Sequence, residues 1–244
     1  MRALAVRLSE TFVGRRIIGE LAVERPEILC GAVGSALSRR SRFGNVRRWP
    51  PELAGFEDVA PIVLSSNAAN RGLAAMRLDE VAHLWRLAQQ SGPGTLVEIG
   101  RERGGSTLVL AAAMHSGARL FSFDPQTKQA ESGRTFDDEL AETLSRYGLE
   151  EKVRLVAEDS QSAQPPAGDY ALVLIDGDPS LDGTRKDFER FGRRVRPGGR
   201  VLFHDAAPGG PRSATLAPLL TELDRDSDYE RKPDVGTFAE FERR

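Results

Sequence analysis

The segment VEIGRERGGST, residues 97–107, decides the fold. A short apolar run leads into a turn that contains Gly100, Gly104 and Gly105, and Ser106 then stands where a helix can begin. A strand, a glycine turn and a helix in this order are typical of a parallel α/β unit, and the helix N-terminus can hold an anionic group. Glycines alone are equally typical of an ordinary tight turn, so the interpretation depends on the rest of the chain.

The sequence around this segment alternates between apolar runs and amphipathic helices. The runs have little internal alternation, as expected of strands that are covered on both faces. They are TLVEI from Thr95, ARLFSF from Ala118, VRLVA from Val153, YALVLI from Tyr170 and RVLFH from Arg200. This order predicts an α/β fold with a doubly wound, parallel sheet and a ligand site at the carboxyl ends of the strands. A late strand near one sheet edge is predicted past Gly236.

The composition excludes several classes of protein. The chain has 244 residues, of which 40% are hydrophobic and 29% charged, and its formal net charge is −2. These values favour one large globular domain and give no overall attraction to nucleic acid. An arginine cluster within residues 39–48 is more typical of a solvated face than of a polyanion site. Cys30 is the only cysteine, so we expect no internal disulfide and a cytoplasmic protein without a signal or membrane segment.

The spacing of the glycine turn disfavours a dinucleotide. In the GxGxxG fingerprint the second glycine lets the backbone approach a pyrophosphate, but Glu102 holds that place here. Glu98 and Asp124 add carboxylates around the turn, and Asp124 stands where an acid can bind both hydroxyls of a ribose. The next strand ends in Asp159 and Ser160, where a purine could be bound. This acidic rim suits an adenosine that carries a cationic group and no phosphate.

More acids follow the fourth and fifth predicted strands. The segment LIDGDPSLDGTRKDF, residues 174–188, places Asp176 and Asp178 after one strand, and His204 and Asp205 end the next. Carboxylates that converge repel one another and need a cation to offset the repulsion. That cation is either a sulfonium group or a metal ion. Without a metal, Asp178 or His204 could act as a general base, and a turn or helix-cap role is the alternative for Asp178.

These motifs together resemble those of class I S-adenosylmethionine-dependent methyltransferases, in the branch that O-methylates small molecules. EIGRERGGST resembles the first motif, FSFDP the second-strand acid, VAEDS the adenine segment, and LIDGDPSLDGTRKDFERFGRRVRPGGRVLFHDA the IDGDHS and FHD strands. The resemblance implies a mostly parallel seven-stranded, Rossmann-like domain over residues 76–244, after an N-terminal helical extension or lid, residues 1–75. The cofactor-binding residues that it implies are Glu98, Gly100, Gly104, Ser106, Asp124, Asp159, Ser160 and Asp176.

A metal ion is one implication of the resemblance. Related methyltransferases that use a divalent ion draw ligands from these strand ends, which would place a magnesium-type ion on Asp176 and Asp205. Two positions depart from the family pattern: Pro179 replaces the histidine of GDHS, and Ala206 stands where metal-dependent relatives often carry Asn or Asp. A metal ion and a metal-free general base therefore both remain open.

The activity that the resemblance implies is transfer of the methyl group of S-adenosylmethionine to an oxygen of a small molecule such as a sugar or secondary metabolite. Asp178, His204 and Asp205 are the expected catalytic residues. We expect no nucleic-acid or membrane partner, and self-association stays open. The alternative is a methyltransferase-like fold that binds the cofactor without transferring methyl, as a partner subunit or the scaffold for another reaction.

Overall fold

The computed structural model of the chain describes residues 76–126 and 134–244. The predicted N-terminal extension and the arginine cluster lie outside the described residues. The described residues fall into two units, 76–86 with 103–113 in the first and 87–102 with 114–126 and 134–244 in the second. Helix α6 (Gly105–Ala113) belongs to the first unit, and α5 (Leu78–Gln90) begins in the first unit and ends in the second.

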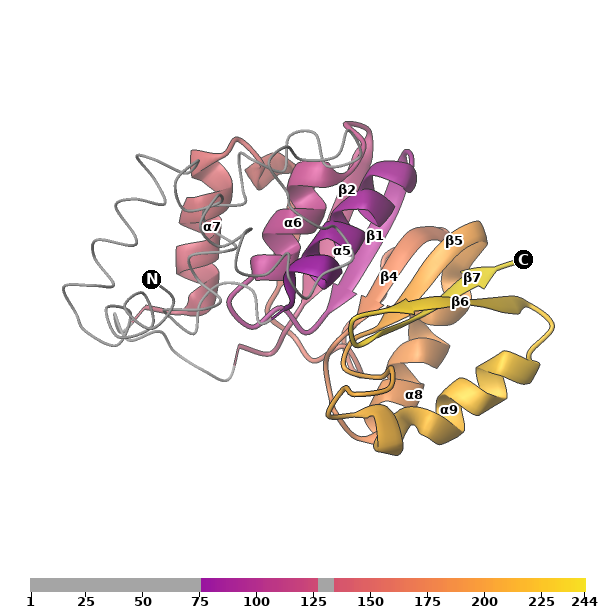
Figure 1. The fold of residues 1–244 in the computed structure, drawn as a ribbon. Helices are drawn as coiled ribbons and strands as arrows, with labels where there is room; N and C mark the ends of the chain where they lie inside the picture. Colours follow the sequence, from indigo (N-terminus) through magenta and orange to yellow (C-terminus); the bar gives the residue numbers. More distant parts are fainter. Residues whose placement is uncertain (1–75, 127–133) are drawn as a thin grey trace, which may run out of the picture. The chain divides into compact units, whose positions relative to one another are not determined.

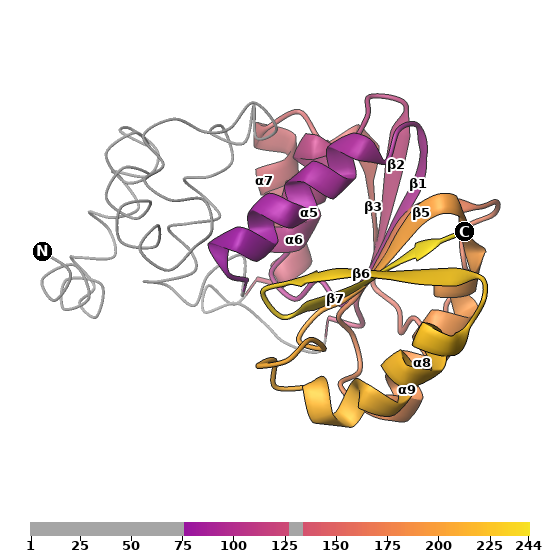
Figure 2. The same cartoon turned by 45° about the vertical axis from the view of Figure 1, so that its right-hand side comes forward.

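The second unit contains a seven-stranded sheet with the order β3-β2-β1-β4-β5-β7-β6 (Figures 1 and 2). Strands β1 to β5 run parallel to one another, and β7 is antiparallel to both β5 and β6. The bounds are β1 Gly94–Ile99, β2 Ala118–Phe123, β3 Val153–Val156, β4 Tyr170–Ile175, β5 Val195–Phe203, β6 Tyr229–Val235 and β7 Phe238–Arg243. The predicted mostly parallel sheet is confirmed, and β7 is the strand expected past Gly236.

The helices of the second unit follow the strands in the expected order. They are α7 (Phe136–Arg146), α8 (Leu181–Arg190) and α9 (Ser213–Arg225), with short 3-10 turns at Glu150–Lys152 and Gly192–Arg194. A capping box between Thr135 and Asp138 begins α7, and the Ser180 hydroxyl accepts from the Gly183 N–H at the start of α8. Among the described residues no helix is long and apolar enough to cross a membrane.

Helices α8 and α9 lie side by side against one face of the sheet (Figures 1 and 2). Alternate residues of the strands, including Val173 and Phe203, point into a core on this face. Phe188 of α8 packs edge-on against Tyr229 with ring centroids 5.5 Å apart, and Phe203 packs edge-on against Phe241 at 6.1 Å. Each fully buried aromatic side chain contributes about 2 to 3 kcal/mol relative to exposure, so this layer holds β4, β5 and β7 rigidly beneath their loops.

The sheet has its topological switch between β1 and β4. The chain moves outward from β1 through β2 to β3 and then returns to the other side of β1 as β4. Gly100, which follows β1, has a φ of 82°, and a Cβ there would lie 2.2 Å from the carbonyl oxygen of Asp176. The Asp176 N–H donates to the Ile99 carbonyl at 2.7 Å. The two strand ends therefore touch through their backbones, at the place where ligands bind in open α/β sheets.

Candidate active site

The carboxylate of Asp124, at the end of β2, organises the glycine turn. Its Oδ2 accepts from the backbone N–H groups of Arg101 at 3.1 Å and Glu102 at 2.9 Å, and its Oδ1 accepts from Gln126 N–H at 2.8 Å. Glu102 and Gln126 have φ values of 42° and 52°, a left-handed conformation that residues other than glycine rarely adopt. The turn is thus wrapped around one negative charge. Ribose binding by this carboxylate stays a prediction.

The side chain of Arg101 is a structural part of this region that the sequence analysis missed. It is buried, and its Nε donates to Asp137 Oδ1 at 2.7 Å while a second guanidinium nitrogen contacts Oδ2 at 2.5 Å. Its third nitrogen donates to the carbonyls of Ser122 at 2.7 Å and Val156 at 3.1 Å. One side chain therefore ties together β2, β3 and α7. Nothing in the sequence marks it, because an arginine in a glycine turn normally extends into solvent.

The other acids predicted near the cofactor differ in exposure. Glu98 is fully buried on β1 and its Oε2 accepts from Ser122 Oγ at 2.5 Å. Asp159 is exposed after β3, and its Oδ1 accepts from Gln161 N–H at 2.9 Å. Only Asp159 of these two offers its carboxylate to solvent at the strand ends. The predicted residues Gly104 and Ser106 belong to the other unit, where Gly104 accepts from Leu108 N–H at the start of α6.

Ser160, expected near the adenine, donates from its hydroxyl to Oδ1 of Asp187 at 2.6 Å. Asp187 lies on α8 and is fully buried, and its Oδ2 has no hydrogen-bond partner. Burial raises the pKa of the Asp187 carboxyl to about 6, and the nearby charges of Asp159 and Asp178 add to the effect. The Ser160 side chain thus joins the segment after β3 to α8. No sequence motif predicts this interaction.

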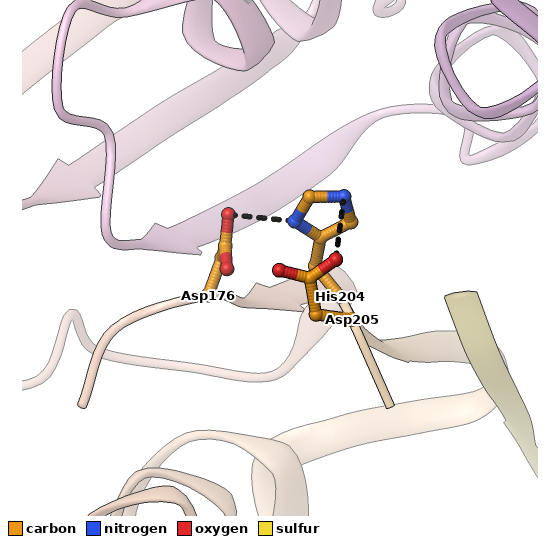
Figure 3. Close-up of side chains that lie close together, drawn as sticks. All are labelled: Asp176, His204 and Asp205. Atoms are coloured by element: carbon orange, nitrogen blue, oxygen red, sulfur yellow. Dashed lines mark hydrogen bonds and ion pairs between the residues drawn. The ribbon is translucent and has the colours of Figure 1, made fainter. Parts of the chain in front are cut away.

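Asp176, His204 and Asp205 come together at the ends of β4 and β5 (Figure 3). His204 Nδ1 lies 3.0 Å from Asp176 Oδ2, and His204 Nε2 lies 3.9 Å from Asp205 Oδ1. The imidazole is buried and packs on the Phe238 ring at 5.1 Å, whereas the side chains of Asp176 and Asp205 are 28% and 30% exposed. The two acids therefore flank opposite nitrogens of one imidazole. The sequence analysis expected Asp178 to converge here too, whereas the structure brings together only Asp176, His204 and Asp205.

Asp205 is held in a strained conformation. Its φ is 61°, which costs a residue with a Cβ on the order of 1 kcal/mol. Thr237 Oγ1 donates to its carboxylate at 3.2 Å, and Arg212 N–H donates to its carbonyl at 2.9 Å. Such strain persists only where the surroundings impose it, and it is concentrated at functional sites. The conformation supports a role for this carboxylate beyond folding.

Asp178 lies apart from this cluster. Its Oδ1 accepts from Ser180 N–H at 2.8 Å and its Oδ2 accepts from Gln161 Nε2 at 3.3 Å. The hydrogen bond from the Ser180 backbone is the main cause that lowers the pKa of Asp178, and the Gln161 amide adds to it. A carboxylate with a lowered pKa is a weaker base, so this geometry favours the turn role for Asp178 over the predicted catalytic one.

Arg212 joins the cluster from the loop before α9, and the sequence analysis did not find it. Its guanidinium is buried; one nitrogen lies 3.4 Å from Asp176 Oδ1. Another donates to the Asp178 carbonyl at 2.8 Å and to Thr184 Oγ1 at 2.7 Å. The segment that contains it, AAPGGPRSA, residues 206–214, has a single cation, which points back into the protein. Glycine and proline content identifies a loop and says little about where its arginine lies.

The donor set does not fit a divalent ion. Asp176, His204 and Asp205 have ligand atoms within 4.8 Å of one another, which is the spacing a metal site requires. However, Oδ2 of Asp176 faces a histidine nitrogen and its Oδ1 faces the Arg212 guanidinium. A metal ion would have to displace a cation and a hydrogen bond from the same carboxylate, and magnesium prefers oxygen ligands to imidazole. The predicted magnesium on Asp176 and Asp205 is therefore not favoured by this geometry.

The cluster is suited to proton transfer. If Nδ1 of His204 donates to Asp176, Nε2 carries the basic lone pair, and Asp176 stabilises the imidazolium that forms on protonation. Asp205 lies on the other side of the ring, with its Oδ1 3.9 Å from Nε2. This arrangement can take a proton from a hydroxyl that is held above the ends of β4 and β5.

Comparison of the sequence with known proteins finds similarity to methyltransferases. Residues 97–206 match a family described as a methyltransferase domain. A curated protein of Mycobacteroides abscessus, named as a candidate O-methyltransferase, is 32% identical over 126 residues. The match covers 50% of this chain and 54% of the relative, so the chain spans about half the length of the curated relative that it matches.

Solved structures with the same fold include two O-methyltransferases with bound ligands. The enzyme from Bacillus cereus, in complex with S-adenosylhomocysteine, has a TM-score of 0.58 at 19% identity, covering 89% of this chain and 100% of its own. The enzyme TomG from Streptomyces achromogenes, involved in tomaymycin synthesis and in complex with S-adenosylmethionine, has a TM-score of 0.56 at 17% identity, covering 89% and 98%. At these identities the likeness establishes a common fold.

Proposed function

We propose that the chain is a class I methyltransferase that transfers a methyl group from S-adenosylmethionine to an oxygen of a small molecule. The match of residues 97–206 to a methyltransferase domain, the similarity to a candidate O-methyltransferase and the fold shared with solved O-methyltransferases support this proposal. The observation that carries the proposal is the imidazole of His204 between two carboxylates, at the ends of adjacent parallel strands. These ends lie beside the switch between β1 and β4, where a nucleoside donor binds in this architecture.

The donor is assigned to the carboxyl ends of β1, β2 and β3. Asp124 fixes the glycine turn there, and Asp159 presents an exposed carboxylate next to it. Negative charge favours a sulfonium nucleoside and repels a pyrophosphate, which supports S-adenosylmethionine over a dinucleotide. In this proposal Asp124 binds the ribose hydroxyls and the segment of Asp159 binds the adenine.

The acceptor is assigned to the ends of β4 and β5. Its hydroxyl approaches the Nε2 side of His204, and Asp205 holds it in line with the methyl group. As the oxygen–carbon bond forms and the carbon–sulfur bond breaks, the hydroxyl proton passes to His204 and S-adenosylhomocysteine leaves. Asp176 stabilises the resulting imidazolium. The sulfonium already supplies a good leaving group, so the protein has to contribute alignment and a base.

Two measurements test this function in sequence. Calorimetry should detect binding of S-adenosylmethionine, and turnover with a panel of phenols, sugars and hydroxylated metabolites should then release S-adenosylhomocysteine. His204→Ala should lower kcat by about 100-fold or more with little change in cofactor affinity. Cofactor binding without product across the panel would favour the non-transferring alternative, and absence of binding would contradict both.

The proposal also covers the cellular location of the protein and the chemical class of its acceptor. The single cysteine and the ordinary composition support a cytoplasmic protein, which cell fractionation would test. A sugar or secondary metabolite as acceptor is consistent with the neighbour from Streptomyces achromogenes, which is involved in tomaymycin synthesis. Activity on the small-molecule panel and none on RNA or protein would support this class.

A further inference from the structure

We propose that Arg212 is the resident cation of the acidic cluster at the ends of β4 and β5, and that this cluster therefore works without a divalent ion. The part of this inference that concerns turnover rests on the proposed methyl transfer. The part that concerns the cluster itself rests on geometry alone. Arg212 acts through Asp176 and is a positioning residue.

The contacts of Arg212 fix its guanidinium at the cluster. One nitrogen lies 3.4 Å from Asp176 Oδ1, and another donates to both the Asp178 carbonyl and the Thr184 hydroxyl at less than 3 Å. The side chain is 8% exposed, so bulk water screens its charge weakly. Because two neutral acceptors also hold a second nitrogen of the same guanidinium, the group cannot easily move away to admit another cation.

Arg212 offsets part of the negative charge of the cluster. Asp176 and Asp205 supply two negative charges, and the buried guanidinium beside Asp176 supplies one positive charge. A divalent ion on the same acids would sit within a few ångströms of a buried guanidinium, which disfavours it by like-charge repulsion. The sequence difference at Ala206, where metal-dependent relatives often carry an oxygen ligand, agrees with this assignment.

The inference predicts a gain of metal binding when the guanidinium is removed. We would titrate the full chain with Mn²⁺, following the free ion by electron paramagnetic resonance. Wild type should bind Mn²⁺ weakly, and Arg212→Gln should bind it at least about tenfold more tightly at one site that Asp205→Asn abolishes in the same background. Arg212→Lys, which keeps the charge, should behave as wild type. Arg225→Gln, which removes an exposed arginine from α9, is the matched control for net charge.

Several results would overturn the assignment. Tight, one-site Mn²⁺ binding by wild type, or no gain in Arg212→Gln, would each do so. If Arg212→Gln does not fold, the wild-type titration and turnover after dialysis against EDTA decide the question: unchanged turnover supports the inference, and loss that Mg²⁺ restores refutes it. A failure of the methyltransferase proposal would be visible separately, as absent cofactor binding in calorimetry, and would leave the Mn²⁺ result unaffected.

Discussion

At the scale of single residues, Asp124 combines a ligand role with a structural one. It accepts backbone N–H groups from both sides of the cofactor turn, and its carboxylate is the proposed partner of the ribose. We expect Asp124→Ala to weaken S-adenosylmethionine binding by about 1 to 3 kcal/mol, since charge-assisted hydrogen bonds are lost. Calorimetry measures this directly. An unchanged dissociation constant would move the donor site elsewhere.

The raised pKa of the buried Asp187 carboxyl should make the stability of the protein depend on pH. Its folded pKa of about 6 lies above the value of about 3.9 expected when it is unfolded, so the stability it contributes is present below pH 4 and is lost as the pH rises through 6. The amide of Asp187→Asn cannot ionise. The free energy of unfolding of this variant, relative to that of wild type, should therefore increase by about 2 to 3 kcal/mol from pH 4 to pH 7. Urea unfolding at several pH values checks this, and a constant difference between the two proteins would contradict it.

The residues of the candidate site show which of its parts could be predicted from the sequence. Asp176, His204 and Asp205 were found because parallel strands must end at one edge of the sheet, so acids after adjacent strands converge. Arg101 and Arg212 were missed because their partners are main-chain carbonyls and acids distant in sequence, which no local spacing encodes. The cations that organise the site follow from tertiary packing and were accessible only from the structure.

At the scale of elements, the Arg101–Asp137 pair fastens α7 to the ends of β2 and β3. Asp137 is 21% exposed while Arg101 is fully buried, so removing the acid leaves an uncompensated charge inside. We expect Asp137→Asn to lower the free energy of unfolding by about 3 kcal/mol and to weaken cofactor binding through the displaced turn. Chemical denaturation and calorimetry measure the two effects.

A control for this prediction lies on the same helix. The exposed pair of Arg134 and Glu142 spans the first turns of α7, and Glu142→Gln should change stability and cofactor binding little because solvent screens the interaction. Equal effects of Asp137→Asn and Glu142→Gln would contradict the role assigned to the buried pair.

The sequence predicted the strands whose residues are buried and missed a strand at the edge of the sheet. The fully buried strand β4, YALVLI, is a continuous apolar run, which is the pattern of strands covered on both faces. Strand β6, YERKPDV, was missed because it lies at the edge of the sheet, where charge is favoured and only its two end residues are buried. β6 forms a strand because it pairs with β7, and the sequence of a single segment does not show which strand it will pair with.

At the scale of the whole molecule, the site depends on two strand ends meeting without a side chain between them. Gly100 follows β1 with a φ of 82°, and a Cβ would lie 2.2 Å from the Asp176 carbonyl oxygen and 2.8 Å from the Gly177 nitrogen. An alanine there must push β4 and its loop away from β1. The carboxylate of Asp176, and through it His204, would then move relative to the donor turn.

The effect of sterics at this junction can be separated from backbone strain. Gly168 has a φ of 87° and open space around the site of a Cβ, so Gly168→Ala should cost about 1 kcal/mol from conformation alone. Gly100→Ala carries the same strain plus the clash, and should cost about 3 kcal/mol or more and lower turnover beyond any loss of folded protein. Denaturation curves and kcat/KM for the folded fraction compare the two variants. If both lose the same stability and keep wild-type turnover, the contact between β1 and β4 does not position the site.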